Sequence, residues 1–169
     1  MSTPAAVADS RDSFPASAEK WLAAFIEGWR APSGAAAFAA HFRPMLAPHV
    51  RLVQPQLPDV TGRDAFEREF VGPMFALMPD IRAEVERWAA QGDVLYIELT
   101  LRGTLGGRPI SWRACDRVTL RAGLAIERES YFDPGPLLAA VVTRPRAWPP
   151  FLRLQARRLA KHLTLRRKS

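Results

Sequence analysis

The sequence predicts an α+β fold, a cone-shaped α+β barrel in which three N-terminal helices pack on a curved antiparallel sheet. Apolar residues recur at helical spacing up to about residue 78, and from Ile81 onward the period falls to two. Turn signals at Gln91-Gly92-Asp93, Gly106-Gly107 and Ala122-Gly123 divide this second half into β-rich runs. With 48% hydrophobic and 24% charged residues, a chain of 169 residues can build one globular domain.

Three amphipathic or alanine-rich segments predict the helices. The first is expected to begin at Ser17 or Ala18, and its apolar stripe comprises Trp21, Leu22, Phe25, Ile26 and Trp29. Ser33 can cap a second helix over Ser33–Phe42, where alanines favour the helical state. The third helix is expected over Arg63–Met78, with inward residues Phe66, Phe70, Met74, Phe75 and Met78.

The remaining segments are read as strands, a loop and two further helices. Val50–Gln54 is expected to be a short strand, and Pro55–Gly62 a loop because its prolines cannot sustain a ladder. The β-rich runs are Ile81–Ala89, Val94–Thr104, Pro109–Arg121 and Leu124–Phe132. A short helix over Leu137–Thr143 and a last helix over Phe151–Leu165 are expected after them.

The charge is concentrated at the C-terminus and suggests three parts: a flexible leader (1–16), the α+β domain (17–138) and a basic amphipathic extension (139–169). Residues 134–169 hold nine Lys or Arg and no acidic residue. The first 133 residues therefore carry 15 basic and 17 acidic groups, so the net charge of +7 belongs to the extension. Such asymmetry indicates an appended interaction segment.

Several functional classes are excluded by what the chain lacks. No apolar run approaches the ~20 residues of a membrane-spanning helix, and the charged N-terminus is not a secretory signal, so the cytoplasm is the expected location. Cys115 is the single cysteine and can form no bridge within the chain. Because phosphate-loop, nucleophile-elbow and zinc patterns are missing, we expect neither cofactor nor metal.

Two short motifs carry a family resemblance. Thr61-Gly62-Arg63-Asp64-Ala65-Phe66 opens the third expected helix, and Ser130-Tyr131-Phe132-Asp133-Pro134 closes the last strand. With the order of elements, they make Ala18–Leu138 resemble the nuclear transport factor 2-like superfamily. The branch it resembles most holds the SnoaL-like polyketide cyclases and limonene-1,2-epoxide hydrolase, and ketosteroid isomerase is a more distant relative. The resemblance implies a pocket for a small molecule, but this fold serves many chemistries.

Most catalytic positions implied by the resemblance hold other residues here. The Asp-Arg-Asp set of limonene epoxide hydrolase falls on Leu99, Leu101 and Ser130, which makes epoxide hydrolysis by that mechanism improbable. The Tyr, carboxylate and acid of ketosteroid isomerase look like Trp21, Gln54 and Trp112.

One acid is retained in the set implied by the polyketide cyclases. Their pocket His falls on Asp116, and their Asp again falls on Ser130. The carboxylate has therefore moved to the neighbouring strand.

The alternation of side chains along each strand predicts which residues line the cavity. If Leu99 and Leu101 face the helices, so do Trp112, Asp116 and, on the last strand, Ile126, Arg128, Ser130 and Phe132. The apolar wall is then expected to comprise Trp21, Phe25, Phe75, Leu99, Leu101, Trp112 and Phe132. The polar groups are expected to be Gln54, Asp116, Arg128 and Ser130.

These residues suggest two functions. The first is a SnoaL-like enzyme that isomerises, cyclises or dehydrates a hydrophobic polyketide, terpenoid or steroid-like molecule, with Asp116 as acid or base and Gln54, Arg128 and Ser130 orienting a carbonyl or hydroxyl. The alternative is a non-catalytic ligand-binding or interaction module, in which Asp116 is a structural carboxylate satisfied by Arg128.

Partners are expected on two surfaces. A homodimer is expected through the outward sheet face, which offers Tyr96, Thr100, Cys115, Val118 and Tyr131. The expected helix Phe151–Leu165 is amphipathic and basic, so residues 151–169 can lie on an anionic membrane surface, or pack on the domain or on a dimer mate. Nucleic acid is the least favoured partner.

Overall fold

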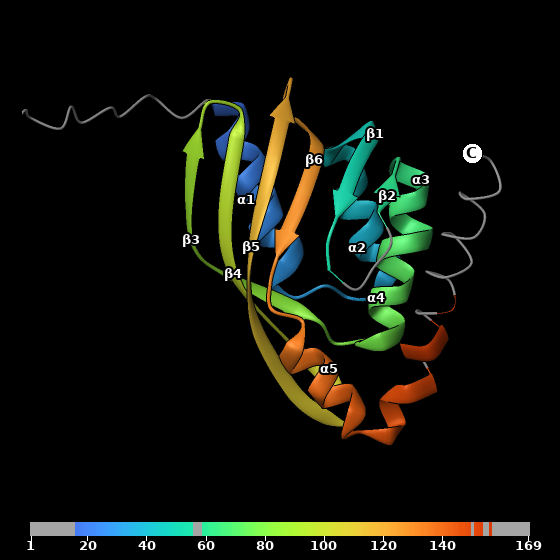
Figure 1. The fold of residues 1–169 in the computed structure, drawn as a ribbon. Helices are drawn as coiled ribbons and strands as arrows, with labels where there is room; N and C mark the ends of the chain where they lie inside the picture. Colours follow the sequence, from blue (N-terminus) through green and yellow to red (C-terminus); the bar gives the residue numbers. More distant parts are fainter. Residues whose placement is uncertain (1–15, 56–58, 150, 154–155, 157–169) are drawn as a thin grey trace, which may run out of the picture.

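The computed structural model describes residues 16–55, 59–149, 151–153 and 156, and it confirms the α+β architecture. Helices pack against a curved, unclosed sheet of six strands in the order β2-β1-β6-β5-β4-β3 (Figure 1). The helical elements are α1 (Ala16–Arg30), α2 (Ala35–Phe42), η1 (Arg43–Met45), α3 (Arg63–Ala65), η2 (Phe66–Val71), α4 (Gly72–Leu77), α5 (Gly135–Val142) and η3 (Pro145–Ala147). The strands are β1 (Leu46–Val53), β2 (Val60–Thr61), β3 (Arg82–Gln91), β4 (Val94–Leu105), β5 (Arg108–Arg121) and β6 (Leu124–Tyr131).

The sheet is mixed, which corrects the prediction of a wholly antiparallel one. β3, β4, β5 and β6 form the expected antiparallel meander, but β1 pairs with β6 in parallel, with Leu52 opposite Arg128. The helical segment and four strands (β2, β3, β4 and β5) separate β1 from β6 in the chain, so no tight turn forces them to run antiparallel. Within the expected loop Pro55–Gly62, Val60 and Thr61 add a short antiparallel edge strand.

β1 begins at Leu46, four residues before the predicted start at Val50. Pro48 lies inside it, where the pairing with β6 is irregular between Leu46 and Arg51. Proline donates no ladder hydrogen bond, and such irregularities are where a strand tolerates it. The β4–β5 hairpin turns at Gly106-Gly107, where both residues have positive φ (60° and 82°), as the sequence predicted from this pair.

The third expected helix is one helical segment whose middle is a π-helix. α3, η2 and α4 follow one another without a break, and the Gly72 N–H donates to the carbonyl of Glu67, five residues back. Pro73 follows directly and has no N–H to donate, so the α-helical ladder cannot continue unbroken through this point. The wider turn buries Phe66, Phe70 and Val71 together.

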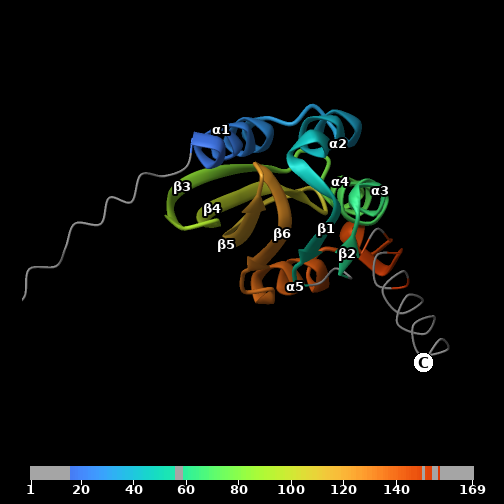
Figure 2. The ribbon, with the colours of Figure 1, turned by 90° about the horizontal axis from the view of Figure 1, so that it is seen from above.

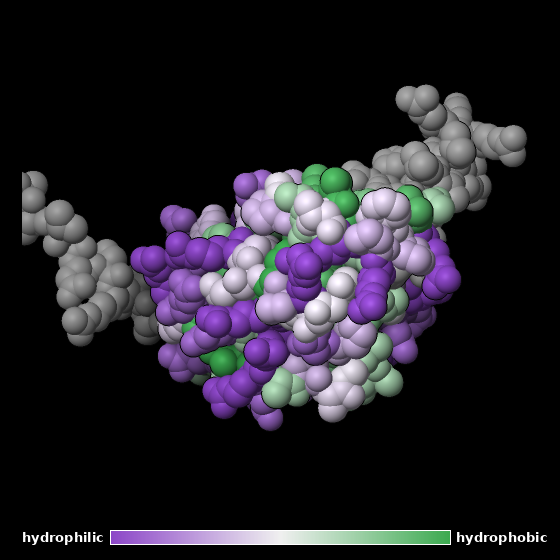
Figure 3. Space-filling model, turned by 90° about the horizontal axis from the view of Figure 1, so that it is seen from below, coloured by the Kyte–Doolittle hydropathy of each residue, from purple (hydrophilic) through white to green (hydrophobic). Residues whose placement is uncertain are grey.

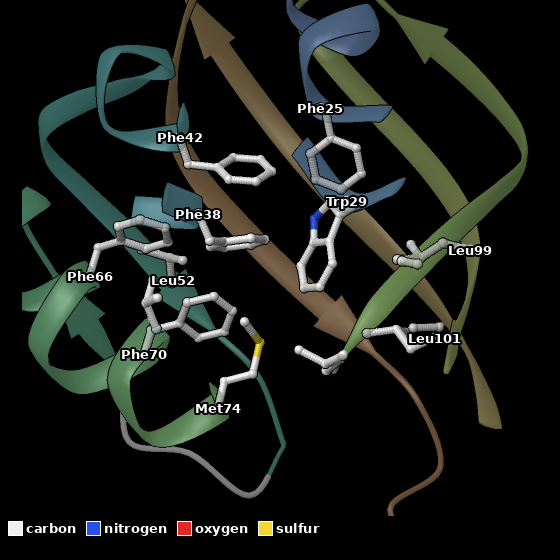
Figure 4. Close-up of a cluster of buried hydrophobic side chains, with 14 of the residues drawn as sticks. Phe25, Trp29, Phe38, Phe42, Leu52, Phe66, Phe70, Met74, Leu99 and Leu101 are labelled. Carbon is white, nitrogen blue, oxygen red and sulfur yellow. The ribbon is translucent and has the colours of Figure 1, made fainter. Parts of the chain in front are cut away.

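An aromatic cluster joins the helices to the sheet (Figure 4). The Trp29 ring lies edge-on to Phe38, 4.8 Å between centroids, and the Phe38 and Phe42 rings are 4.4 Å apart. α1 and α2 approach closely at Gly28, where a Cβ atom would lie 2.5 Å from the His41 ring. His41 Nε2 lies 2.8 Å from the Ala24 carbonyl oxygen, so this histidine has a structural role.

Strand parity holds on β4 and β5 and shifts once on β6. Val118 is fully buried with Ala114 and Asp116, which corrects its expected place on the outward face. On β6 the register with β5 shifts between Thr119 and Leu120, so Ala125, and not Ile126, packs into the core. The additional residue at this β-bulge turns Ile126 away while Arg128 and Ser130 stay inward.

After β6 the chain continues into α5 and η3, and α5 lies at the lower end of the sheet in Figure 1. α5 begins two residues before the predicted Leu137, because Pro136 is tolerated in the first helical turn. Of the last expected helix, the described residues 151–153 and 156 are helical, and the rest lies outside the described residues, as do positions 1–15 of the leader. None of the described helices is long and apolar enough to cross a membrane.

Asp80 is predicted to stabilise the turn that leads from α4 into β3. Its Oδ1 and Oδ2 accept hydrogen bonds of 2.7 Å from the Thr104 N–H and the Thr104 hydroxyl, and the hydroxyl in particular holds the pKa of this carboxyl below its usual value. Replacing Asp80 by Ala should lower the free energy of unfolding by about 1 kcal/mol at neutral pH.

The effect of Asp80 should depend on pH in a defined direction. A lowered folded-state pKa gives stability that is complete above the unfolded pKa of about 3.9 and is lost as the pH falls through the folded value. Urea denaturation of the wild type and of Asp80→Ala at neutral and acidic pH measures this difference. Asp93→Ala, at an exposed turn, is the matched control, and a difference that persists undiminished in acid would contradict the assignment.

Candidate functional site

A cavity of about 100 Å³ lies between the inner face of β5 and β6 and the segment α3–α4. Its wall is almost wholly apolar and comes from α1, the end of β1, η2, α4, the sheet and α5. The lining residues are Trp29, Gln54, Pro55, Phe70, Pro73, Met74, Leu77, Met78, Ile81, Leu101, Trp112, Ala114, Asp116, Arg128, Ser130, Phe132 and Leu137. Figure 4 shows Trp29, Phe70, Met74 and Leu101 pointing toward one another from their different elements.

The polar centre of the cavity is an ion pair between neighbouring strands. Asp116 on β5 is fully buried, and its Oδ2 accepts a 2.7 Å hydrogen bond from Nε of Arg128 on β6. Ser130, directly opposite Asp116, donates from Oγ to Oδ1 at 2.6 Å. Each carboxylate oxygen thus accepts one hydrogen bond, so the buried carboxylate has a partner on both sides.

The guanidinium of Arg128 lies close to two aromatic rings as well as to Asp116. Its guanidinium carbon lies 5.9 Å from the Trp29 ring centroid and 5.4 Å from that of Phe70, and its side chain is 12% exposed. Contacts of this kind attract a cation to the faces of aromatic rings. Nε makes the single hydrogen bond that the described residues offer this guanidinium, so Nη1 and Nη2 remain available to another acceptor.

Two further polar groups reach the cavity without a partner among the described residues. The indole N–H of Trp112 is buried and finds no acceptor there, although a buried donor normally has one. Gln54 follows Val53, the last residue of β1, and lines the same cavity as Ser130. The amide of Gln54 forms no hydrogen bond with the residues described.

The structure brings most of the predicted site together. Gln54, Leu101, Trp112, Asp116, Arg128 and Ser130 all line the cavity. Trp21 and Leu99 do not, and neither do Phe25 and Phe75. Trp21 instead donates from its indole to the Met45 carbonyl at 3.0 Å, and Leu99 is fully buried in the core.

Sequence reasoning missed Trp29 and Phe70, the two rings that flank Arg128. Both belong to apolar stripes that the sequence does show, but periodicity gives a helix face and not the position along the helix at which the cavity lies. Trp29 is at the C-terminal end of its stripe. Following that stripe to its end would have found it.

Outside the cavity, Cys115 faces the other side of the sheet. Burial raises the pKa of its thiol, and the nearby Asp116 and Glu98 charges raise it further. A thiol that resists ionisation is a poor nucleophile. Among the described residues, no three His, Cys, Asp or Glu side chains converge as a metal site would require.

The fold and the position of this cavity define a class of protein, the cone-shaped nuclear transport factor 2-like fold. Residues 22–128 match the sequence profile of the SnoaL-like domain, and the chain therefore belongs to the SnoaL-like family. No curated protein sequence matches the chain significantly.

Solved structures share the fold at low sequence identity. A protein of Jannaschia sp. CCS1 with a provisional name as a SnoaL-like polyketide cyclase has 24% identity and a TM-score of 0.61, over 79% of this chain and 93% of its own. TerC, crystallised with polyporic acid, has 20% identity and a TM-score of 0.65, over 74% and 98%. A limonene epoxide hydrolase-like enzyme of M. tuberculosis has 14% identity and a TM-score of 0.60, over 78% and 93%.

The buried ion pair should dominate the stability of the site. Removing one partner of a buried pair leaves an uncompensated charge or donor, so Asp116→Ala and Arg128→Met should each lower the free energy of unfolding by about 3–5 kcal/mol. The double variant should lose much less than the sum. Chemical denaturation of both single variants and the double variant measures this coupling.

Two matched variants separate this effect from ordinary surface pairing. Arg117 pairs with Glu127 and Glu129 at 2.9 and 2.8 Å on the more exposed face of the same sheet, so Arg117→Met should cost less than about 1 kcal/mol. Ser130→Ala should cost about 1 kcal/mol. Additive losses in the Asp116 and Arg128 variants would contradict a coupled pair.

Proposed function

We propose that the cavity binds a hydrophobic small molecule and that Asp116 transfers a proton during its isomerisation, cyclisation or dehydration. The observation that carries this proposal is the juxtaposition, within one apolar cavity, of a buried carboxylate with an arginine whose two Nη groups form no hydrogen bond to any described residue. Apolar walls with few converging polar groups are typical of small-molecule sites.

The ion pair supplies a base and an oxyanion-stabilising donor together. A carbonyl oxygen of the substrate accepts from Arg128 Nη1 or Nη2, and Asp116 takes a proton from the adjacent carbon. The electrons of the broken C–H bond move to the carbonyl oxygen, where the guanidinium stabilises the developing charge. Each Asp116 oxygen retains acceptor capacity beside its one donor, so it can receive this proton.

The fate of the enolate decides the reaction. Return of the proton from Asp116 to another carbon isomerises the substrate. Attack of the enolate carbon on a second carbonyl cyclises it, and the new alkoxide takes the proton back from Asp116. Loss of a β-hydroxyl dehydrates it, since the hydroxyl takes the same proton and leaves as water. Gln54 and Ser130, which both line the cavity, orient the second oxygen that the latter two reactions need.

The dimensions of the cavity limit what enters it. A volume of about 100 Å³ is below the ~300–1,000 Å³ of typical ligand pockets, and an engineered cavity of ~150 Å³ holds one benzene molecule. At about two thirds of the volume that holds benzene, the cavity can enclose the reacting carbonyl and the carbons next to it, while an attached ring lies partly outside. The remainder of a polyketide, terpenoid or steroid-like substrate would extend out of it.

The burial of Asp116 favours a second function, that of a non-catalytic ligand-binding module. Its carboxylate is fully buried, and both of its oxygens already accept hydrogen bonds. In this case Asp116 only fixes Arg128, and the free Nη groups bind a ligand oxygen without chemistry. The structure of TerC with polyporic acid is an example of this fold with a small molecule.

A simple ketone distinguishes the two functions. Acetophenone carries one ring and one carbonyl with exchangeable α-protons, and its deuterium uptake in D₂O can be followed by proton NMR. The wild type should accelerate exchange over buffer, and Asp116→Asn should reduce it to the buffer rate while still binding acetophenone. Binding without acceleration in the wild type would favour the non-catalytic module.

The role of Arg128 in this binding has its own control. In α-methylstyrene a CH₂ group replaces the carbonyl oxygen of acetophenone at nearly the same shape. The wild type should prefer acetophenone, and Arg128→Met should lose that preference. Thermal shift detects the binding, because ligand at ~100 times its dissociation constant adds about 2.7 kcal/mol of stability.

We also propose that the chain forms a homodimer through the outward sheet face. Tyr96 and Tyr131 are exposed there, on a face where Arg113 pairs with Glu86 at 3.2 Å and also with Glu98. Paired charges leave this face nearly neutral, which suits contact with a second copy of itself.

Sedimentation velocity tests the dimer at micromolar concentration. The wild type should sediment as a dimer, and Tyr96→Asp combined with Tyr131→Asp should sediment as a monomer with an unchanged circular dichroism spectrum, because like charges would then meet across the two-fold axis. A monomeric wild type would contradict the interface.

A further inference from the structure

The chain is longer than the domain that it shares with its relatives. The SnoaL-like profile ends at residue 128, and the three similar structures named above cover 74–79% of this chain and 93–98% of their own. α5 and the residues after it follow the end of the matched profile. What these residues do must therefore be argued from their own structure.

A set of exposed apolar and basic side chains, here named the basic apolar surface, gathers at this end of the molecule. α5 buries Ala140 and Val141 and leaves the other side of the helix exposed. The members of the surface are Leu138, Val142, Arg146, Trp148, Leu152 and Arg153. Figure 3 looks onto the end of the molecule that holds α5 and shows apolar residues (green) among hydrophilic ones (purple).

This surface is held to the domain by specific contacts. Arg144 donates from Nη1 to the carbonyl oxygens of Leu105 and Arg108, both at 3.0 Å, and so fixes the end of α5 to the β4–β5 hairpin. The Trp148 indole donates to the Val141 carbonyl at 2.8 Å, which places the Trp148 ring beside α5. These hydrogen bonds hold α5 and Trp148 in fixed positions on the domain, and so fix the exposed apolar side chains that they carry.

The exposure of these side chains is too large for an ordinary surface. Val142 is 71% exposed and Leu152 62%, and Trp148, whose ring is amphipathic, is 47% exposed. Large apolar groups gathered on a surface and rimmed by charge mark an interaction site. Trp is enriched where one end of a side chain is apolar and the other end is wet, as at a membrane interface.

Charge selects the partner. Residues 134–169 contain nine basic and no acidic residues, whereas the preceding 133 residues contain 15 basic and 17 acidic ones. The basic charge therefore complements an anionic partner, and the net charge of −2 on the first 133 residues is too small to neutralise it. The phosphates of nucleic acid could also pair with the arginines, but they would leave the apolar side chains of Val142 and Leu152 exposed to water. A membrane would bury these side chains at the boundary between its headgroups and acyl chains.

We propose that the basic apolar surface docks on an anionic membrane surface. Its aliphatic side chains and Trp148 enter the boundary between headgroups and acyl chains. Arg146 and Arg153 lie against the lipid phosphates. The catalytic cavity is not part of this surface, so docking brings the domain to a lipid phase without altering its site residues.

Vesicle flotation with the full chain tests the proposal. The protein should float with vesicles that mix phosphatidylcholine and phosphatidylglycerol, should not float with phosphatidylcholine alone, and should bind less as salt is raised. Arg146→Gln with Arg153→Gln should lower the partition coefficient by about fivefold for each arginine, roughly 30-fold in total. Arg82→Gln with Arg121→Gln removes the same charge elsewhere and should change it much less.

A second pair of variants isolates the apolar contribution. Val142→Ser with Leu152→Ser keeps every charge and should still lower the partition coefficient by about tenfold or more. Because both side chains are largely exposed, these variants should fold like the wild type, which circular dichroism verifies.

Three outcomes would overturn the proposal. Unchanged flotation of Val142→Ser with Leu152→Ser would mean that binding is purely electrostatic. Tight binding of a fluorescent DNA duplex without vesicle binding would identify the partner as nucleic acid. A change in sedimenting mass in the same variants, again without vesicle binding, would show that the surface covers a second copy of the chain.

Discussion

The ion pair between Asp116 and Arg128 is the interaction on which the site and much of the fold depend. It joins two neighbouring strands, and it can form only if their register brings Ser130 opposite Asp116. It also draws the guanidinium between Trp29 on α1 and Phe70 on η2, so four elements meet at one charge. A buried charge without this pairing would be prohibitively unfavourable. The contacts that pair it also make the cavity polar, and they fix the position of the helices on the sheet.

The sequence predicted this centre because strand parity is a strict rule wherever the pairing is regular. Asp116, Arg128 and Ser130 point inward as the period of two requires, and the same rule correctly predicted Leu101 and Trp112. It failed for Ile126, because the bulge adds a residue that no periodicity reveals, and the expected outward place of Val118 contradicted the parity of its own strand.

Two features of the fold depend on long-range pairing and could not be derived from local patterns. Whether β1 runs parallel or antiparallel to β6 is decided by how the helical segment between β1 and β3 packs, and the local sequence of β1 reads the same in both cases. Likewise, the positions of Trp29 and Phe70 in helical stripes identify a buried face without telling which ring meets Arg128. The helix over Arg63–Met78 was correctly located. Its π-turn was not predicted, and it arises because Pro73 has no N–H with which to continue the α-helical hydrogen bonds.

The tryptophans have a practical consequence for the study of this protein. Trp29 and Trp112 line the cavity, one buried against the guanidinium of Arg128 and the other with an indole N–H that has no acceptor among the described residues. Indole emission responds to nearby charge, hydrogen bonding and the displacement of solvent. The protein therefore carries one intrinsic optical probe on the helix side of its cavity and one on the sheet side, and occupancy can be read from its own fluorescence without attaching a dye.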